Sequence, residues 1–224
     1  MKHFSLLFIG IFSIVASSFL GLIITSQNQI GALKQSTESL ELNDEGALVM
    51  VEGDPLFPKN LSGSASQGHL EYIKLGCVNC HSQQIRRTSI SSDISRGLGL
   101  RYSVPRDYIL QKKVVLGTQR VGPDLSNVGL RQRDKNWHLL HLYNPQITSP
   151  GSVMPSFSFL FELKSEESVP ENSVLNFPEE STYAPEKGSV IVPSRRANAL
   201  VNYLLSLKFD YNLPEAIISE NEAK

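Results

Sequence analysis

A long apolar run opens the chain. Residues 4–24 contain no charged residue, and Met1, Lys2 and His3 precede them. At 1.5 Å per residue, a helix of this length spans about 30 Å, the thickness of a bilayer's hydrocarbon core. A cleavable signal peptide has a shorter apolar core, of about 7–15 residues, and ends in a small-x-small site, which residues 25–32 lack. The pattern therefore predicts a retained single-pass anchor over residues 1–26, with a signal peptide as the alternative.

The charges flanking this run predict its orientation. Lys2 and the amino terminus precede it, whereas acidic residues dominate the sequence that follows. Because positive flanks stay on the cytoplasmic side, we expect everything after residue 25 to lie outside.

Behind the anchor, a polar stretch gives way to short amphipathic helices. Residues 27–63 are broken by glycine and proline and are expected to form a connector. Helical spacing of apolar residues predicts helices at about 66–75, 134–143 and 195–207. A residue that can cap each helix stands at its start: Ser64 or Ser66, Asp134 or Asn136, and Ser194.

These elements predict an all-α domain over residues 64–210, preceded by the transmembrane helix. Residues 162–193 are acidic and turn-rich, so we expect a solvated excursion there. Residues 211–224 form a polar tail that is expected to fray.

Composition narrows the functional classes. The net charge of the 224 residues is −1. No basic excess is available to meet phosphates, so a nucleic-acid partner is not expected. The two cysteines are both used by the motif described next, which leaves none for a disulfide framework.

The two cysteines belong to a C-x-x-C-H motif formed by Cys77, Cys80 and His81. This spacing is the attachment signal for a c-type haem, in which both thiols bond to the haem and the histidine is an axial ligand of the iron. A thioredoxin-like dithiol is the first alternative, but no βαβ alternation surrounds Cys77. Half of a zinc site is the second, but it would need two further ligands at short spacing.

Met154 is the candidate for the second axial ligand. It lies in a loop rich in proline and glycine, downstream of the haem motif, rather than on an apolar helical face. A core methionine is the alternative. The rival ligands are His69, His138, His141 and Met50, and the two histidines spaced i, i+3 are interpreted as surface or partner-facing residues.

Two further groups are candidates to support the haem. A ligating histidine needs an acceptor for its other ring nitrogen, and the carbonyl of Pro123 in a Gly-Pro turn could supply it. Arginines in residues 82–116 could pair with haem propionates. Arg86 and Arg101 are the candidates, and solvated surface is the alternative.

Together these features resemble the class I cytochrome c fold, in which the first and last helices cross with a glycine against an aromatic residue. Gly68 and Tyr203 match that pair. A narrower resemblance covers residues 66–161. Its motifs are Cys80–Arg86 (CHSQQIR), Gly117–Leu125 (GTQRVGPDL), Trp137–Pro145 (WHLLHLYNP) and Met154–Phe157 (MPSF), and they are similar to subunit II of cbb3-type cytochrome c oxidase.

This resemblance implies a non-catalytic electron-transfer subunit with one covalent haem c, anchored in the inner membrane of a bacterium with its haem domain in the periplasm. It would take electrons from another cytochrome c subunit or carrier and pass them to the catalytic haem–copper subunit, which reduces oxygen to water. The alternatives are the monohaem subunit of a nitric oxide reductase, a free-standing anchored cytochrome c and, from another class, a C-x-x-C thiol oxidoreductase.

Overall fold

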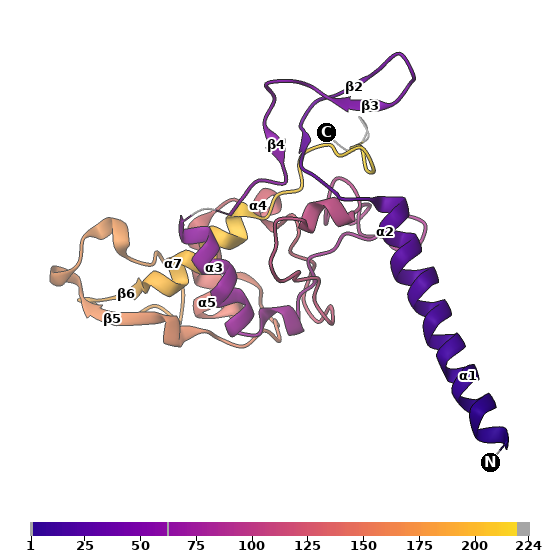
Figure 1. Cartoon of the computed structure of the whole chain (residues 1–224). Coiled ribbons are helices and arrows are strands. Elements are labelled where there is room, and N and C mark those ends of the chain that lie inside the picture. Colours follow the sequence, from indigo (N-terminus) through magenta and orange to yellow (C-terminus); the bar gives the residue numbers. More distant parts are fainter. Residues whose placement is uncertain (1, 62, 219–224) are drawn as a thin grey trace. The chain divides into compact units, whose positions relative to one another are not determined.

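The computed structural model describes residues 2–61 and 63–218, and the chain divides into two compact units between Gln35 and Ser36 (Figure 1). In the first unit, helix α1 (Lys2–Ser18) continues through a π-helical turn, η1 (Phe19–Ile24), into α2 (Thr25–Ile30). The stretch Phe4–Gln29 is long and apolar enough to cross a membrane, and no residue in its most apolar part is buried within the protein. This fits the expected anchor.

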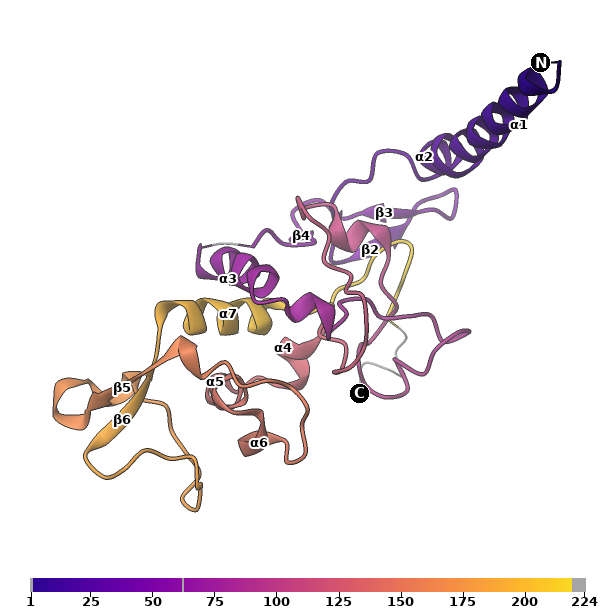
Figure 2. The ribbon, with the colours of Figure 1, turned by 90° about the horizontal axis from the view of Figure 1, so that it is seen from below.

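The second unit is not all-α, so that prediction was wrong. The chain is about 39% helix and about 10% strand. Within the described residues, the strands form three two-stranded antiparallel sheets, which pair β1 (Ser36–Thr37) with β4 (Leu56–Phe57), β2 (Leu40–Leu42) with β3 (Leu48–Met50), and β5 (Phe161–Ser165) with β6 (Ser189–Pro193). Two of these sheets lie in the expected connector, and the third frames the expected excursion (Figure 2).

The predicted helices are present, and short helical turns join them. The α-helices are α3 (Gly63–Lys74), α4 (Val128–Arg131), α5 (Lys135–Tyr143), α6 (Pro145–Thr148) and α7 (Arg195–Ser206). The 3-10 turns are η2 (Cys77–Asn79), η3 (Pro105–Tyr108), η4 (Ser158–Leu160), η5 (Glu166–Ser168) and η6 (Glu171–Ser173). Two of the expected caps are confirmed: Asp134 accepts from the backbone N–H of Asn136, and Ser194 accepts from that of Ala197.

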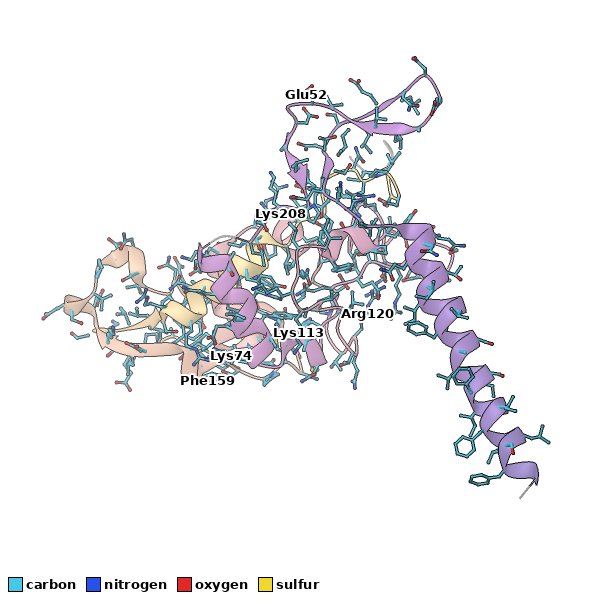
Figure 3. All side chains as sticks on the ribbon, viewed as in Figure 1. Glu52, Lys74, Lys113, Arg120, Phe159 and Lys208 are labelled. Carbon is cyan, nitrogen blue, oxygen red and sulfur yellow. The ribbon has the colours of Figure 1, made fainter. Side chains whose placement is uncertain are left out.

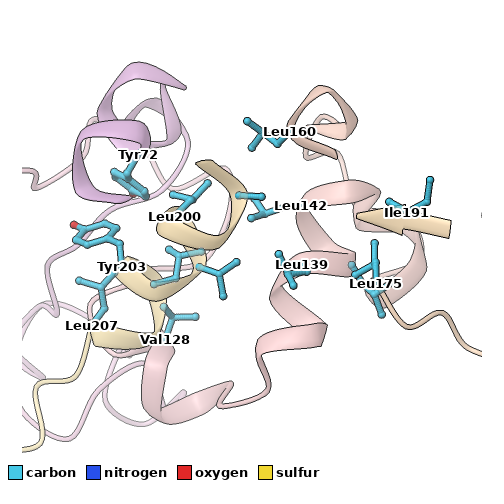
Figure 4. Packing of buried hydrophobic residues seen from close by; sticks show 14 of the residues in the cluster. Tyr72, Val128, Leu139, Leu142, Leu160, Leu175, Ile191, Leu200, Tyr203 and Leu207 are labelled. Carbon is cyan, nitrogen blue, oxygen red and sulfur yellow. The ribbon is translucent and has the colours of Figure 1, made fainter. Parts of the chain in front are cut away.

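Helices α3 and α7 cross at Gly68, as expected. A Cβ on Gly68 would lie 1.9 Å from the carbonyl oxygen of Ala199 and 2.7 Å from Cβ of Tyr203, so only a glycine allows this approach. The main core forms around the crossing, with the rings of Tyr72 and Tyr203 5.4 Å apart (Figure 4). The crossing holds α3, and therefore the haem motif that follows it, at a fixed position on the core.

A second, smaller core joins three distant parts of the chain. Phe57 stacks on Tyr211 with ring centroids 4.3 Å apart, and Val104 and Phe209 pack beside them. Leu213 is fully buried in the same cluster. The first residues of the expected tail are therefore part of the folded unit, while residues 219–224 lie outside the described residues.

Candidate haem site

The five residues expected to attach, ligate or directly support the haem iron all line one cavity of about 740 Å³. They are Cys77, Cys80, His81, Pro123 and Met154. Most of the remaining wall is apolar and comes from α3 and the residue after it, the segment around the Gly-Pro turn, α4, α5, α7 and the loop before η4. It includes Tyr72, Leu75, Val121, Leu125, Val128, Leu142, Val153, Phe157, Leu200 and Leu204. The volume lies within the roughly 300–1,000 Å³ typical of cofactor pockets.

The end of α3 places both thiols and the imidazole on one tight turn. Gly76 follows the helix with φ 75°, a left-handed conformation that glycine adopts without strain. The backbone N–H groups of Cys80 and His81 then both donate to the carbonyl of Cys77, at 3.1 and 3.0 Å. Burial raises the pKa of the Cys77 thiol to about 11, whereas Cys80 is exposed.

The His81 ring is held by the Gly-Pro turn. Its Nδ1 lies 2.8 Å from the carbonyl oxygen of Pro123. A carbonyl oxygen can only accept, so this contact requires the proton on Nδ1 and leaves a lone pair on Nε2. A Cβ on Gly122 would lie 2.2 Å from Cε1 of His81, so the turn approaches the ring this closely only because residue 122 is glycine. Such an arrangement is what a metal-ligating histidine needs.

A buried carboxylate fixes this turn to the extended segment after His81. Asp124 is fully buried, and its Oδ2 accepts from the Ser82 hydroxyl at 2.6 Å and from the Gln84 backbone N–H at 2.8 Å. The N–H of Ser126 donates to its Oδ1 at 2.8 Å. Arg120 Nε donates to the Ser82 hydroxyl at 2.7 Å, and its guanidinium also pairs with Asp93. The position of Pro123 is thus set by charge-assisted hydrogen bonds.

Met154 reaches the cavity from a loop braced by one glutamine. The Gln146 side chain donates to the carbonyl of Ser152 at 2.6 Å and accepts from the N–H of Gly151 at 2.8 Å. Beyond Met154, the N–H of Phe157 donates to the carbonyl of Leu142 at 2.8 Å. Both ends of the loop are therefore tied to the α5–α6 region.

Neither candidate arginine lines the cavity. Arg101 is 2% exposed, and its guanidinium forms bidentate hydrogen bonds to the carboxylate of Asp107, at 3.0 and 2.7 Å. The side chain of Arg86 is exposed on the surface. Arg131, which the sequence reading did not select, does line the cavity, and one of its nitrogens donates to the carbonyl of Asp124.

The rival ligands divide into two groups. His69 and Met50 do not line the cavity, whereas His138 and His141 do. Interpreting His138 as a surface residue was wrong, because it is 3% exposed and its Nε2 lies 2.9 Å from the carbonyl of Gln132. His141 is half-buried, and burial lowers its pKa to about 4.

The α5 histidines already have partners of their own. Nδ1 of His141 lies 2.6 Å from the hydroxyl of Thr148, and its ring stacks on Trp137 at 4.8 Å. The i, i+3 spacing placed both histidines on one helical face. The face of α5 that packs inward is set by how α5 lies against α7. The local sequence carries no information about that packing.

Sequence reasoning also missed the polar residues that brace the site: Ser82, Gln83, Arg120 and Asp124. The Gln83 amide oxygen accepts from the Tyr203 hydroxyl at 2.9 Å, which links the segment after His81 to α7. A signal was available, because each of these residues lies within two positions of His81 or of the Gly-Pro turn in the sequence.

The donor set and the shape of the site fit a haem. Two thiols and an oriented imidazole share one turn, a thioether comes from another wall, and apolar side chains surround them. Residues 59–206 match a protein family described as cytochrome C oxidase, mono-heme subunit/FixO. A search of curated proteins found no match. Because the match covers well over half of the chain, the protein belongs to the FixO family and is a mono-haem, electron-transferring subunit of a cytochrome c oxidase complex.

Proposed function

We propose that the chain is an electron relay built on one covalently attached haem c. Cys77 and Cys80 would form the two thioether bonds, and His81 and Met154 would be the axial ligands. The observation that carries the proposal is the 2.8 Å contact between Nδ1 of His81 and the Pro123 carbonyl, at a cavity that also receives both thiols and the thioether.

The side chains of this site each have a definite task. Pro123 keeps the proton on Nδ1 of His81, so that Nε2 can donate its lone pair. Met154 would supply a thioether, which would favour Fe(II) and raise the reduction potential. The apolar walls exclude water. When bound, the haem supplies one-electron chemistry through its Fe(III)/Fe(II) couple.

The relay would take electrons from another cytochrome c and pass them to the catalytic haem–copper subunit. With His81 and Met154 occupying both axial positions, the chain would offer no site for oxygen, which supports a non-catalytic role. The positive charge before the apolar helix, on Lys2 and the amino terminus, supports an outer location for the haem domain, the periplasmic side in a bacterium. The raised pKa of Cys77 favours this reading over a thiol oxidoreductase, whose attacking cysteine needs a lowered pKa.

Haem staining after a denaturing gel tests covalent attachment. We expect a stained band for the full-length protein and none for the variant Cys77→Ser with Cys80→Ser. A wild-type chain that loses its haem on the gel would refute the proposal. Purification of the native complex tests the role: a copper-containing partner is expected, and a partner with non-haem iron would instead indicate a nitric oxide reductase.

A further inference from the structure

The β2–β3 hairpin carries an apolar face that the residues described by the structure leave largely uncovered. The register pairs Leu40 with Met50 and Leu42 with Leu48. Directly opposed residues of an antiparallel pair lie on the same side, and alternate residues of a strand share a face. These four apolar side chains therefore occupy one face, while Glu41 and Val49 occupy the other.

This face is open to its surroundings. Leu42 is 70% exposed and Met50 is 58% exposed, and Leu40 and Leu48 are only half-buried. The hairpin projects from the rest of the second unit (Figure 1). Figure 3 draws the side chains of this region and labels Glu52, which lies in the loop that follows β3. Apolar side chains grouped on an exposed face mark an interaction site.

The fold holds this hairpin in one shape. Its turn is closed by Asn43, whose side-chain oxygen accepts from the N–H groups of Glu45 and Ala47 at 3.1 and 2.8 Å. Its base is joined to β1, because the N–H of Val51 donates to the Thr37 hydroxyl at 3.0 Å. Phe57 on β4 is anchored in turn in the second core by its stacking on Tyr211. A preorganised surface of this kind binds without a large ordering cost.

The surrounding charge selects the partner. Residues 36–57 contain six acidic residues and no basic ones: Glu38, Glu41, Asp44, Glu45, Glu52 and Asp54. Two such hairpins would repel each other, and so would a hairpin and an anionic lipid surface. The remaining tail of the chain, residues 219–224, offers no large apolar side chain to cover the face.

We propose that the apolar face of β2–β3 docks onto another subunit of the oxidase complex, at an apolar patch framed by lysine or arginine side chains. This inference rests on the proposed function, because it needs the complex to exist. The hairpin follows the apolar helix after only nine residues, 31–39. A membrane-anchored chain therefore keeps it within reach of a membrane-embedded partner.

Site-specific photo-crosslinking in native membranes tests the proposal. Leu42→p-benzoylphenylalanine should cross-link to another oxidase subunit, and Val49→p-benzoylphenylalanine, on the opposite face, should do so far less. A covalent dimer of this chain, an adduct with lipid only, no adduct, or equal cross-linking from both faces would each overturn it.

A second measurement uses pull-down of the full-length protein. The double variant Leu42→Ser with Met50→Ser should retain roughly tenfold less partner, the loss expected when buried anchor residues of an interface are truncated. Val49→Ser should retain the wild-type amount, and haem staining should be unchanged in both. Wild-type retention by the double variant would refute the inference alone. If the wild-type chain itself captured no copper-containing partner, the proposed function would fail instead.

Discussion

Asp124 offers the sharpest test of how the site is held. Its fully buried carboxylate accepts from the Ser82 hydroxyl and the Gln84 N–H on one oxygen, and from the Ser126 N–H on the other. The substitution Asp124→Asn keeps the size of the side chain but turns one oxygen into a donor. Whichever way the amide is oriented, at least one of these donors then faces an NH₂ group.

The expected loss of stability follows from the hydrogen bonds that this substitution breaks or weakens. The less damaging orientation gives up the bond from Ser126 and leaves its N–H buried and unpaired, while the bonds from Ser82 and Gln84 lose their charge assistance. A hydrogen bond to a buried charge contributes about 1.5–3 kcal/mol, so the free energy of unfolding should fall by about 2–4 kcal/mol. That is a large share of the roughly 5–15 kcal/mol that stabilises a typical domain.

Guanidinium unfolding of the haem-loaded, full-length protein in detergent measures this change. Trp137 is the single tryptophan and lines the cavity, so its fluorescence reports on the site itself. The matched control is Asp134→Asn, because Asp134 is an exposed helix cap and asparagine caps equally well. The control should change the free energy by less than about 0.5 kcal/mol. If Asp124→Asn were no more destabilising than the control, Asp124 would not brace the turn that carries Pro123.

Three further substitutions test the ligand, a buried carboxylate and the helix crossing. Met154→Ala should keep the covalent haem but abolish the weak near-infrared sulfur-to-iron band of the oxidised protein; a surviving band would exclude Met154 as a ligand. Burial alone would raise the pKa of Asp93, but hydrogen bonds from Arg120 and its neighbours hold it below its ordinary 3.8. Ionised Asp93 therefore contributes its full share of the free energy of unfolding above about pH 4, and this contribution is lost as the pH falls. The destabilisation caused by Asp93→Asn should therefore shrink in unfolding curves recorded at about pH 3 and below. A destabilisation that stays constant with pH would contradict this. Gly68→Ala would place a Cβ 1.9 Å from a backbone oxygen of α7. Thermal unfolding should show that the free energy of unfolding falls by about 1–3 kcal/mol or more, whereas Ser66→Ala, on the exposed side of α3, should change it very little. Equal effects of the two substitutions would argue against the tight crossing.

Much of the site could be predicted because its signals are local. The C-x-x-C-H spacing needs no tertiary information, and the caps Asp134 and Ser194 mark helix starts through hydrogen bonds to residues two or three positions along the chain. The pairing of Gly68 with Tyr203 came from a resemblance to a fold, and the structure has that contact. These features depend on short sequence patterns, or on a pattern shared with a known architecture.

The strands were missed because their sequence signal is weak. Alternation over Leu40, Glu41 and Leu42 is only three residues long, and the surrounding glycines, prolines and acidic residues are typical of loops. β5 and β6 are also far apart in sequence, and both lie at the ends of an acidic segment. Their pairing depends on contacts between distant residues, which no window of the sequence contains.

The arginines could not be assigned from the sequence for a different physical reason. Sequence marks an arginine as a possible partner for a carboxylate but does not say which carboxylate lies nearby. Arg101 is forked on Asp107 in the second core, whereas Arg131 lines the cavity. The two side chains have the same chemistry. Only the fold determines that Arg101 forms a structural ion pair and that Arg131 lies beside the candidate haem site.

The long segment between the haem motif and the Gly-Pro turn shows why buried polar groups recur in this fold. Among residues 82–116, the only regular element that the structure describes is η3, so backbone ladders cannot hold the segment in place. Buried side chains do so instead. Asp124 and Gln83 tie its start to the Gly-Pro turn and to α7, and Arg101 with Asp107 ties its later part to the carbonyl of Tyr211. Because each of these bonds would be costly to break in a buried setting, the loops around His81 resist displacement. Such rigidity suits electron transfer, because a site that moves little when its charge changes by one has a low reorganisation energy.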